Sequence, residues 1–342
     1  ASVRSELHKR KIQFVFADEV HYVKNRSSKR SEALYEFGTA KMKIGATATP
    51  VGKNPEDIFG IFKFICPTMF PSFSNFARLY IKYAGYGRVV GVKNKEHLVK
   101  KYAPHVIVKT KEEISSQLPS LVVIQRYCDM TSDQLEATQR IMTDLEEFKK
   151  QEQAIRNKCK SESVIKSNSE LMRLEAMILA LQTFAQEIAD APQLLLNTES
   201  EMSKNYSISD LTSPKLEMMA ELVEEIIDSG EKVCIFSKYE RMQPIIAERI
   251  KEIDKDIKIA FVNGKLKDKA RYAEVYDKFR DDPDYKVLLM TDAGAEGLNL
   301  SKCKYLIEYD LAESYSIQTQ RHGRVERSDS VHDTVFVYQL IA

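Results

Sequence analysis

Two adjacent carboxylates follow a short apolar run near the start of the sequence. Residues 11–21 read KIQFVFADEVH, so Asp18 and Glu19 come directly after a segment typical of a strand buried on both faces. Ligands of open parallel sheets bind just beyond the carboxyl ends of the strands. One carboxylate there can hold a hydrated Mg²⁺, and the other can orient an attacking water. The pair could instead cap the following helix, and these residues alone leave the two interpretations evenly balanced.

A pair of arginines near the end of the sequence suits related chemistry. Residues 320–327 read QRHGRVER, which on a helix would place Arg324 and Arg327 on one face. Two planar guanidiniums in fixed register suit the spread negative charge of a transferring phosphoryl group. A solvated basic helix end is the alternative interpretation, and it is the commoner fate of an isolated arginine pair.

Taken together, these segments resemble two motifs of the superfamily-two helicase motors. DEVH at residues 18–21 resembles the second motif, and QRHGRVER resembles the sixth. GATATP at residues 45–50 resembles the third motif, in which Thr47 and Thr49 would connect the nucleotide site to the nucleic-acid track. A plain turn at the end of a strand is an equally weighted alternative for GATATP.

The sequence from residue 232 onward adds loops that narrow the resemblance. Apolar segments alternate there with helical ones, which is typical of a doubly wound parallel sheet with its loops along one edge. KVCIFSKYERM resembles the fourth motif, and LLMTDAGAEGLNLS the fifth, of the Swi/Snf-like branch, the double-stranded-DNA translocases. The resemblance spans nearly the whole chain. It implies an α/β fold of two RecA-like lobes, the first truncated, with a helical insertion between them.

The resemblance also implies residues that bind ATP and Mg²⁺. Asp18 would hold the metal through water, and Glu19 would act as general base on the attacking water. His21, Gly297 and Asn299 would lie at the cofactor. The implied cofactors are therefore ATP and Mg²⁺.

Further roles are implied for the end of the chain and for the sheet-edge loops. Arg324 and Arg327 would stabilise charge on the γ-phosphate from the opposite lobe, and Gln320 would position their helix. Hydroxyls, lysines and backbone amides in the loops would meet DNA phosphates without reading the base sequence. The residues predicted to contact nucleic acid are Thr47, Thr49, Ser237, Lys238, Lys265, Thr291 and Asp292.

The chain is expected to divide into three parts. Residues 1–110 would form a partial first lobe, residues 111–200 a helical insertion, and residues 201–342 the second lobe. Residues 199–212 lack aliphatic periodicity and are predicted to be a linker. A helix should follow, because Ser213 can cap it before a proline at its first position.

Shorter patterns predict individual elements outside the second lobe. Apolar residues indicate short strands at residues 41–49, 105–109 and 121–130. Residues 131–197 are dominated by helical periodicity. The phenylalanine-rich stretch at residues 54–102 favours a helical packing patch over a base-stacking platform.

No G-x-x-x-x-G-K-[ST] phosphate loop occurs in the sequence. In the Swi/Snf-like branch this loop precedes the second motif, so we expect the chain to be a fragment of a longer protein with such a loop upstream. Its first lobe should then leave a sheet edge or an apolar face uncovered. Val20, the form of GATATP and the lack of Gly-Gln after the arginines depart from the branch pattern. These departures indicate a divergent member, viral or bacterial, and argue against a eukaryotic chromatin role.

Composition limits the class of protein. The chain has 342 residues with 51 Lys and Arg against 50 Asp and Glu, which argues against a generally basic coat but allows a local basic cleft. Its five cysteines are widely spaced, as in reduced intracellular proteins, and no apolar run approaches the ~20 residues of a membrane helix. We expect a monomer of the cytoplasm, nucleoid or nucleus without a membrane partner.

The leading hypothesis is the C-terminal portion of an ATP-dependent double-stranded-DNA translocase. Such a motor would couple ATP hydrolysis to movement on DNA or to remodelling of protein–DNA complexes, and the isolated chain would be inactive. A strand-separating helicase, or the motor of a restriction system, is the first alternative. A non-enzymatic scaffold that binds nucleic acid or a partner is the second, and nucleotide affinity would separate it from the others.

Overall fold

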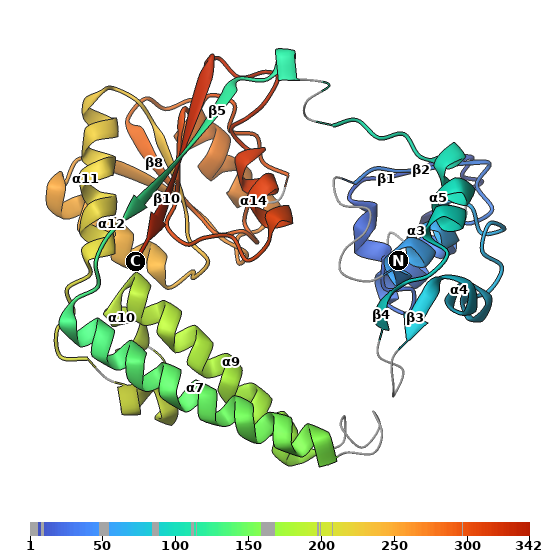
Figure 1. Cartoon of the computed structure of the whole chain (residues 1–342). Helices are drawn as coiled ribbons and strands as arrows, with labels where there is room; N and C mark the ends of the chain where they lie inside the picture. Colours follow the sequence, from blue (N-terminus) through green and yellow to red (C-terminus); the bar gives the residue numbers. More distant parts are fainter. Residues whose placement is uncertain are drawn as a thin grey trace. The chain divides into compact units, whose positions relative to one another are not determined.

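The computed structural model describes most of the chain as two units. The described residues are 6–7, 10–47, 55–83, 89–110, 113, 115–158, 168–196, 198, 200–206, 208–295 and 297–342. The two compact units are Ala1–Val108 and Lys109–Ala342 (Figure 1). Among the described residues, no helix is both long enough and apolar enough to cross a membrane.

A fully parallel, six-stranded sheet forms the centre of the second unit. Its strands lie in the order β5-β10-β9-β6-β8-β7. Their bounds are β5 Ser120–Tyr127, β6 Val233–Phe236, β7 Lys258–Val262, β8 Tyr285–Met290, β9 Tyr305–Glu308 and β10 Thr334–Ile341. Every residue of β6 is buried, as expected for a central strand covered on both faces. The predicted doubly wound sheet is confirmed.

Helices cover both faces of this sheet. α11 (Pro214–Asp228) and α12 (Met242–Ile253) pack on one face through residues such as Met219 and Ile246. The π-helical turn Ala273–Arg280, which continues α13 (Asp268–Tyr272), packs on the other through Val275 and Phe279. α14 (Tyr315–His322) precedes β10. The layers are those of a RecA-like lobe.

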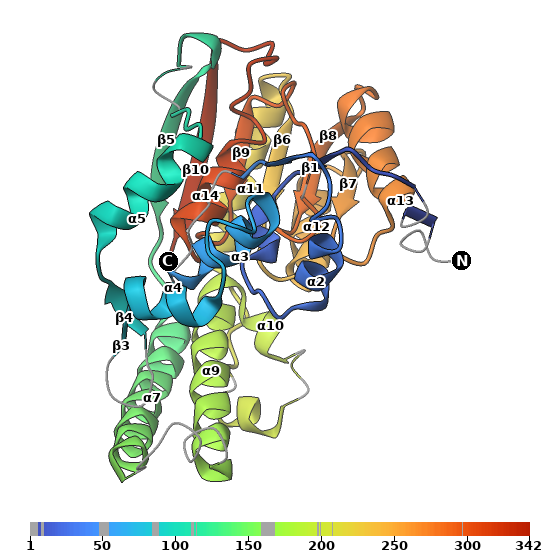
Figure 2. The same cartoon turned by 90° about the vertical axis from the view of Figure 1, so that its right-hand side faces the viewer.

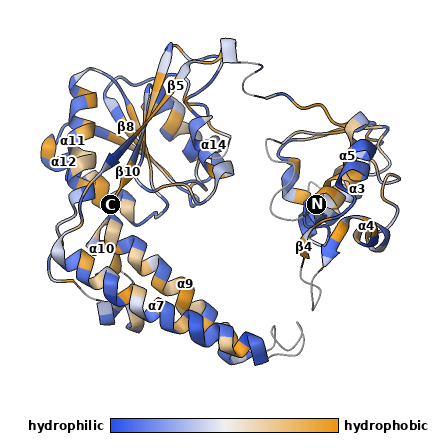
Figure 3. Ribbon diagram, viewed as in Figure 1, coloured by the Kyte–Doolittle hydropathy of each residue, from blue (hydrophilic) through white to orange (hydrophobic). Residues whose placement is uncertain are grey.

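A long antiparallel hairpin of helices extends from the second unit. It consists of α7 (Ser132–Lys158) and α9 (Ser169–Asp190), followed by α10 (Pro192–Leu196) (Figures 1 and 2). Gln134 donates a hydrogen bond to the Ile188 carbonyl, so the start of α7 lies beside the end of α9. Hydrophilic and hydrophobic residues alternate along both helices (Figure 3), as their amphipathic pattern predicts.

The start of α11 forms as local signals predict. The Ser213 hydroxyl accepts a hydrogen bond from the Leu216 amide, and Pro214 occupies the first helical position. Gly230 follows the helix with φ +83°, a left-handed conformation that glycine adopts without strain.

Three predictions about the middle of the chain differ from the structure. Residues 105–109 are not a strand, and the Ile107 side chain is 91% exposed. β5 confirms the strand predicted at residues 121–130, but it lies inside the predicted helical insertion and pairs with β10 in the sheet of the second unit. The predicted linker contains the 3₁₀ helix Glu201–Tyr206, which packs against α7 and α9 through Tyr206. An apolar pattern indicates that a segment can pair or pack, but it does not identify the distant partner.

The first unit contains a two-stranded parallel sheet and a helical cluster. β1 (Phe14–Ala17) pairs with β2 (Met42–Gly45). The remaining elements are the 3₁₀ helix Val20–Val23, α2 (Lys29–Tyr35), α3 (Glu56–Ile65), α4 (Phe73–Tyr80), β3 (Ile81–Tyr83), β4 (Val89–Val92) and α5 (Lys95–Tyr102). Phe59, Phe62, Phe70 and Phe76 are buried together, so the predicted aromatic packing patch is confirmed.

One face of the small sheet is apolar and exposed. Phe14 pairs with Met42 and Phe16 with Ile44, and these four side chains are 44–58% exposed. The intervening Val15 pairs with Lys43 and packs against the core on the other face. The prediction that this strand is buried on both faces is therefore wrong for the described residues, and the prediction of an uncovered apolar face is confirmed.

Amide hydrogen exchange should be faster in β1 and β2 than in β6 and β8. β6 and β8 lie within a six-stranded sheet covered on both faces, whereas β1 and β2 pair only with each other among the described residues. Local opening of the small sheet therefore exposes little additional apolar surface. Equal or greater protection of β1 and β2 in the same sample would contradict this account of their stability.

Candidate functional site

Asp18 and Glu19 lie in the turn that follows β1. The Asp18 side chain is exposed and its Oδ1 accepts a hydrogen bond of 2.9 Å from the Glu19 amide. Glu19 precedes the 3₁₀ helix Val20–Val23 with φ +48° and forms no side-chain cap to it. The helix-capping interpretation of Glu19 is therefore wrong. A left-handed conformation is uncommon for glutamate, and such strain is frequent at functional sites.

His21 connects the second and third predicted motifs within the first unit. Its Nδ1 is 3.1 Å from Glu19 Oε2 and 3.0 Å from Thr47 Oγ1. The imidazole thus lies between the Glu19 carboxylate and the segment after β2. Thr49 lies outside the described residues.

Gly45 permits the close approach of these two segments. A Cβ at Gly45 would lie 2.9 Å from the side chain of Val20, which is itself buried. The Val20 amide donates to the Ala46 carbonyl, and the Ala46 amide donates to the Ala17 carbonyl. A small residue at position 45 is therefore required for the turn after β1 to pack against the turn after β2.

The groups after β1 fit a hydrated Mg²⁺ held by one carboxylate. Among the described residues, no cluster of three or more His, Cys, Asp or Glu side chains could ligate a metal by itself. Mg²⁺ keeps several waters and is commonly held by one or two carboxylates together with substrate phosphates. The exposed Asp18 carboxylate suits that mode, with Glu19 beside it for a water.

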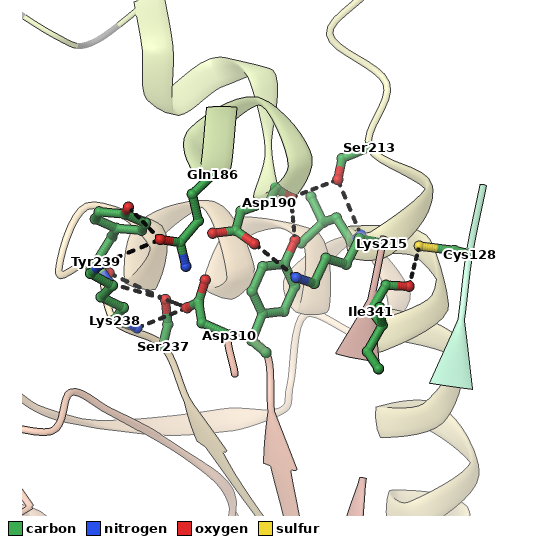
Figure 4. Close-up of polar contacts among 12 residues, drawn as sticks. Cys128, Gln186, Asp190, Ser213, Lys215, Ser237, Lys238, Tyr239, Asp310 and Ile341 are labelled. Atoms are coloured by element: carbon green, nitrogen blue, oxygen red, sulfur yellow. Dashed lines mark hydrogen bonds and ion pairs between the residues drawn. The ribbon is translucent and has the colours of Figure 1, made fainter. Parts of the chain in front are cut away.

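Loops after β6 and β9 meet at the carboxyl edge of the large sheet. The Ser237 hydroxyl and the Lys238 amide both donate to Asp310 Oδ2, each at 2.8 Å (Figure 4). Ser237 is buried, so its hydroxyl is used inside the fold. Lys238 Nζ lies 2.6 Å from a Glu313 carboxylate oxygen and remains partly exposed.

The other predicted phosphate-contacting residues differ in how far they face solvent. The Lys265 side chain is 82% exposed, with its ammonium 2.8 Å from Glu240. Thr291 is buried, and its hydroxyl accepts a hydrogen bond from the Gly294 amide. Of the predicted residues in this unit, Lys238 and Lys265 present positive charge at the sheet edge, whereas Asp292 is paired with Arg321.

Arg324 and Arg327 meet at one backbone oxygen. α14 ends at His322, so the two arginines lie in the following turn and the prediction that they share a helical face is wrong. Both guanidiniums nevertheless donate to the Leu298 carbonyl at 3.1 Å. The fifth and sixth predicted motifs are therefore in contact. Gln320 occupies the last turn of α14.

Gly297 and Asn299 shape the loop on which the arginines converge. Gly297 has φ +73°, which turns the chain before Leu298. Asn299 donates from its backbone amide to the Tyr276 hydroxyl and from its side-chain amide to Asp329 Oδ2. These contacts hold the loop from both sides.

Arg321 is a buried residue of this site that sequence reasoning missed. It is 2% exposed and donates to both carboxylate oxygens of Asp292, at 2.7 and 2.8 Å, and to the Asp310 carbonyl at 2.6 Å. Burial disfavours its charge, but the carboxylates of Asp292, Glu308 and Asp310 together outweigh that effect, and the pKa of Arg321 is raised above its ordinary value. The sequence did place an acidic residue, Asp292, just after a predicted strand and an arginine, Arg321, in the predicted sixth motif. A possible pair between these two residues was the available signal.

A second buried cluster joins the helical hairpin to the sheet edge (Figure 4). Lys215 Nζ donates to Asp190 Oδ1 at 2.8 Å, and both side chains are nearly inaccessible to solvent. The Tyr309 and Ser213 hydroxyls donate to the Asp190 carbonyl. Asp190 ends α9, so this cluster anchors the hairpin to the edge that carries the Ser237–Lys238 loop.

Asp190 and Asp310 share this cluster with the buried Lys215 ammonium. Burial and the neighbouring Asp310 carboxylate raise the pKa of Asp190 well above its usual range, and Lys215 offsets only part of this effect. Burial acts on Asp310 too, but its hydrogen bond with Asp190 and the charge of Lys215 hold the pKa of Asp310 below its usual value. Of the two carboxyl groups, Asp190 therefore favours the protonated form and Asp310 the ionised form.

Comparison with known families decides the relationship of the chain. A profile of the SNF2-related domain matches residues 1–194, and one of the helicase conserved C-terminal domain matches residues 214–329. The chain belongs to the SNF2-related domain family. Both parts of the Swi/Snf-like resemblance, before and after residue 200, are thereby confirmed.

Individual SNF2-family relatives are distant. The SNF2 domain-containing protein ENL1 of Oryza sativa is 26% identical over 369 residues, covering 96% of this chain and 36% of the relative. The putative ATP-dependent helicase/translocase YwqA of Bacillus subtilis is 25% identical over 313 residues, covering 91% of this chain and 31% of the relative. The chain thus spans about a third of the length of these two proteins.

A solved structure supports the fold of two RecA-like lobes. The helicase domain of Pyrococcus furiosus Hef aligns with 99% of this chain and 74% of its own chain, with a TM-score of 0.54 and 16% identity. This likeness concerns the fold alone. In this SNF2-family chain, the described part of the first lobe contributes β1 and β2, and the second lobe contributes the complete parallel sheet.

Proposed function

We propose that this chain belongs to an ATP-dependent translocase that moves on double-stranded DNA or remodels protein–DNA complexes. The observation that carries the proposal is the pairing of motif residues across separate segments. His21 joins Glu19 to Thr47, and Leu298 joins Arg324 to Arg327. Such fixed groups suit phosphoryl transfer, which depends mainly on positioning and charge stabilisation.

The first unit would supply the groups that act on the attacking water. Bound ATP with Mg²⁺ would provide the phosphoryl group and the metal charge that activates it. Asp18 would hold a metal-bound water, and Glu19 would accept a proton from the attacking water. His21 would orient the Glu19 carboxylate, because its Nδ1 lies 3.1 Å from Oε2.

The second unit would supply positive charge for the γ-phosphate and lysines that bind the DNA backbone. Arg324 and Arg327 would stabilise the charge that develops on the γ-phosphate. Arg321 would act as a positioning residue, because its contacts with Asp292 and Asp310 fix the turn that carries both arginines. Lys238 and Lys265 would contact DNA phosphates without reading sequence.

The test of this function is ATP hydrolysis by the complete protein with and without double-stranded DNA. We expect hydrolysis that requires Mg²⁺ and rises several-fold when duplex DNA is added. The Glu19→Gln variant, prepared identically, controls for contaminating ATPases. Hydrolysis that is absent, or that persists unchanged in Glu19→Gln, would contradict the proposal.

The 342-residue chain on its own is expected to hydrolyse no ATP, with or without DNA. The sequence contains no G-x-x-x-x-G-K-[ST] loop, the element that holds the β- and γ-phosphates in NTPases of this type. A phosphate-release assay on the purified chain checks this. Turnover that duplex DNA stimulates and that Glu19→Gln removes would prove the expectation wrong.

A further inference from the structure

Charge is divided very unevenly between the two units. Residues 1–108 contain 19 Lys and Arg but only 8 Asp and Glu, a net charge of +11. Residues 109–342 contain 32 Lys and Arg and 42 Asp and Glu, a net charge of −10. The near-neutral total therefore conceals a strongly basic first unit. A basic domain is the electrostatic footprint expected for a polyanion-binding surface.

Four cations of the first unit gather in one segment, which we call the basic loop. It comprises residues 24–30, KNRSSKR, between the 3₁₀ helix Val20–Val23 and the first turn of α2 (α2 is labelled in Figure 2). The cationic side chains are all exposed, and no ion pair to them is present among the described residues. They are Lys24, Arg26, Lys29 and Arg30.

The backbone of the basic loop is fixed by buried contacts. Ser31, fully buried, donates from its hydroxyl to the carbonyls of Val23 and Asn25, at 3.1 and 2.6 Å. Gly60 of α3 lies directly beneath, where a Cβ would come within 2.3 Å of the Lys24 carbonyl oxygen. Glycine at position 60 is therefore what allows the loop to pack onto α3.

The two arginines are held by aromatic rings. The Arg26 guanidinium lies 3.9 Å from the centroid of the Phe73 ring, and the Arg30 guanidinium 4.6 Å from that of Tyr22. Stacking on one face leaves the N–H edges of a guanidinium available to an oxyanion. Because rings and backbone are already in place, binding would cost less side-chain entropy than it does for free lysines.

We propose that the basic loop binds the phosphate backbone of double-stranded DNA and supplies much of this chain's DNA affinity. Arg26 and Arg30 donate to successive phosphates, and Lys24 and Lys29 add unspecific attraction. The motif pattern did not include these residues among those predicted to contact DNA. The assignment rests on the proposed function, because it takes DNA to be the polymer on which the protein moves.

The phosphates of a nucleoside triphosphate are the alternative ligand for these cations, because the basic loop follows Asp18–His21 closely in the chain. Duplex DNA is favoured because the charge is spread over the whole unit and along several exposed side chains. A single triphosphate would occupy only one convergent group of donors. The two sources of phosphate are distinguished by measuring both ligands.

The test compares the full 342-residue chain with its Arg26→Gln/Arg30→Gln variant. Binding to a duplex of random sequence is measured without nucleotide across a salt series, and Mg²⁺–ATP binding is measured separately. We expect affinity for DNA to fall about tenfold at low salt, and the slope of log K against log salt to become shallower by about two, since two phosphate contacts are lost. ATP affinity should not change.

Two matched variants separate the loop from overall charge. Lys95→Gln/Lys100→Gln removes the same charge from α5 of the same unit, and Lys149→Gln/Lys150→Gln removes it from α7. The proposal predicts a smaller loss for the first and almost none for the second. Equal losses in the basic-loop and α5 variants, an unchanged salt slope, or a loss of ATP binding alone would overturn it. Each of these results leaves the proposed function standing, because DNA-stimulated hydrolysis by the complete protein tests that function separately.

Discussion

Replacing Arg324 or Arg327 by alanine in the complete protein is expected to reduce the rate of ATP hydrolysis by about a thousandfold, with DNA affinity nearly unchanged. Arginines that stabilise a transferring phosphoryl group act on the transition state, and their removal slows hydrolysis by about a thousandfold or more. Both side chains donate to the Leu298 carbonyl, so we expect them to act together. The double variant should therefore hydrolyse ATP only a little more slowly than either single variant.

Single-turnover rates and DNA-binding curves measured on the same preparations check this expectation. Arg280→Ala is the matched control, because Arg280 is a partly exposed arginine of the same unit that pairs with Asp281. It should hydrolyse ATP at the parental rate. If an Arg324 or Arg327 variant also does so, that arginine does not act on phosphate.

Removing the Lys215 ammonium, as in Lys215→Met, is expected to lower the free energy of unfolding by about 3–5 kcal/mol at neutral pH. Lys215 stabilises the negative charge that Asp190 and Asp310 share in this buried site. A loss of that size is typical when the cation of a buried ion pair is removed and the negative charge stays behind. Asp310→Asn should also be damaging, because the lowered pKa of Asp310 favours its carboxylate, which accepts hydrogen bonds from the Ser237 hydroxyl and the Lys238 amide. Asp190→Asn should cost far less, because the asparagine amide imitates a protonated carboxyl group.

The dependence of stability on pH distinguishes this account from a simple salt bridge. The pKa of Asp190 is raised in the folded state, so the folded protein keeps a proton that the unfolded chain loses above about pH 4. The contribution of Asp190 to stability is therefore full below that pH and falls as the pH rises. Denaturant unfolding of wild type and Asp190→Asn should diverge in favour of the variant as the pH rises above about 4. A variant that loses stability relative to wild type as the pH rises would show that Asp190 is ionised in the folded protein.

Local signals in the sequence predicted the elements that depend on neighbouring residues. Ser213 and Pro214 marked the start of α11 correctly, and the apolar segments after residue 232 indicated the strands of a doubly wound sheet. The alternation after residue 232 predicted the parallel sheet and the edge where Ser237 and Asp310 meet. These features follow from capping chemistry and from the period of the apolar residues.

Features that depend on distant partners were not predictable from the sequence. β5 and β10 pair across more than two hundred residues. Residues 105–109 were also predicted to be a strand, but they form none in the structure. Their apolar pattern alone did not show which of the two segments had a partner. Arg321 lies next to Gln320, yet its role arises from a contact with Asp292. Asp190 ends α9, and its role arises from contacts with Lys215 and Asp310, which are distant in the sequence. In each case the residue types were visible in the sequence, but their contacts with distant residues were not.

Movement along double-stranded DNA is the property that tests the central claim most directly. It can be measured as ATP-dependent displacement of a third strand from a DNA triplex by the complete protein, with strand separation of a forked duplex followed in parallel. The account predicts that the third strand is displaced only with hydrolysable ATP, that Glu19→Gln abolishes displacement, and that the duplex stays paired. Separation of the duplex strands, or failure to displace the third strand by a protein that binds DNA and hydrolyses ATP, would contradict it.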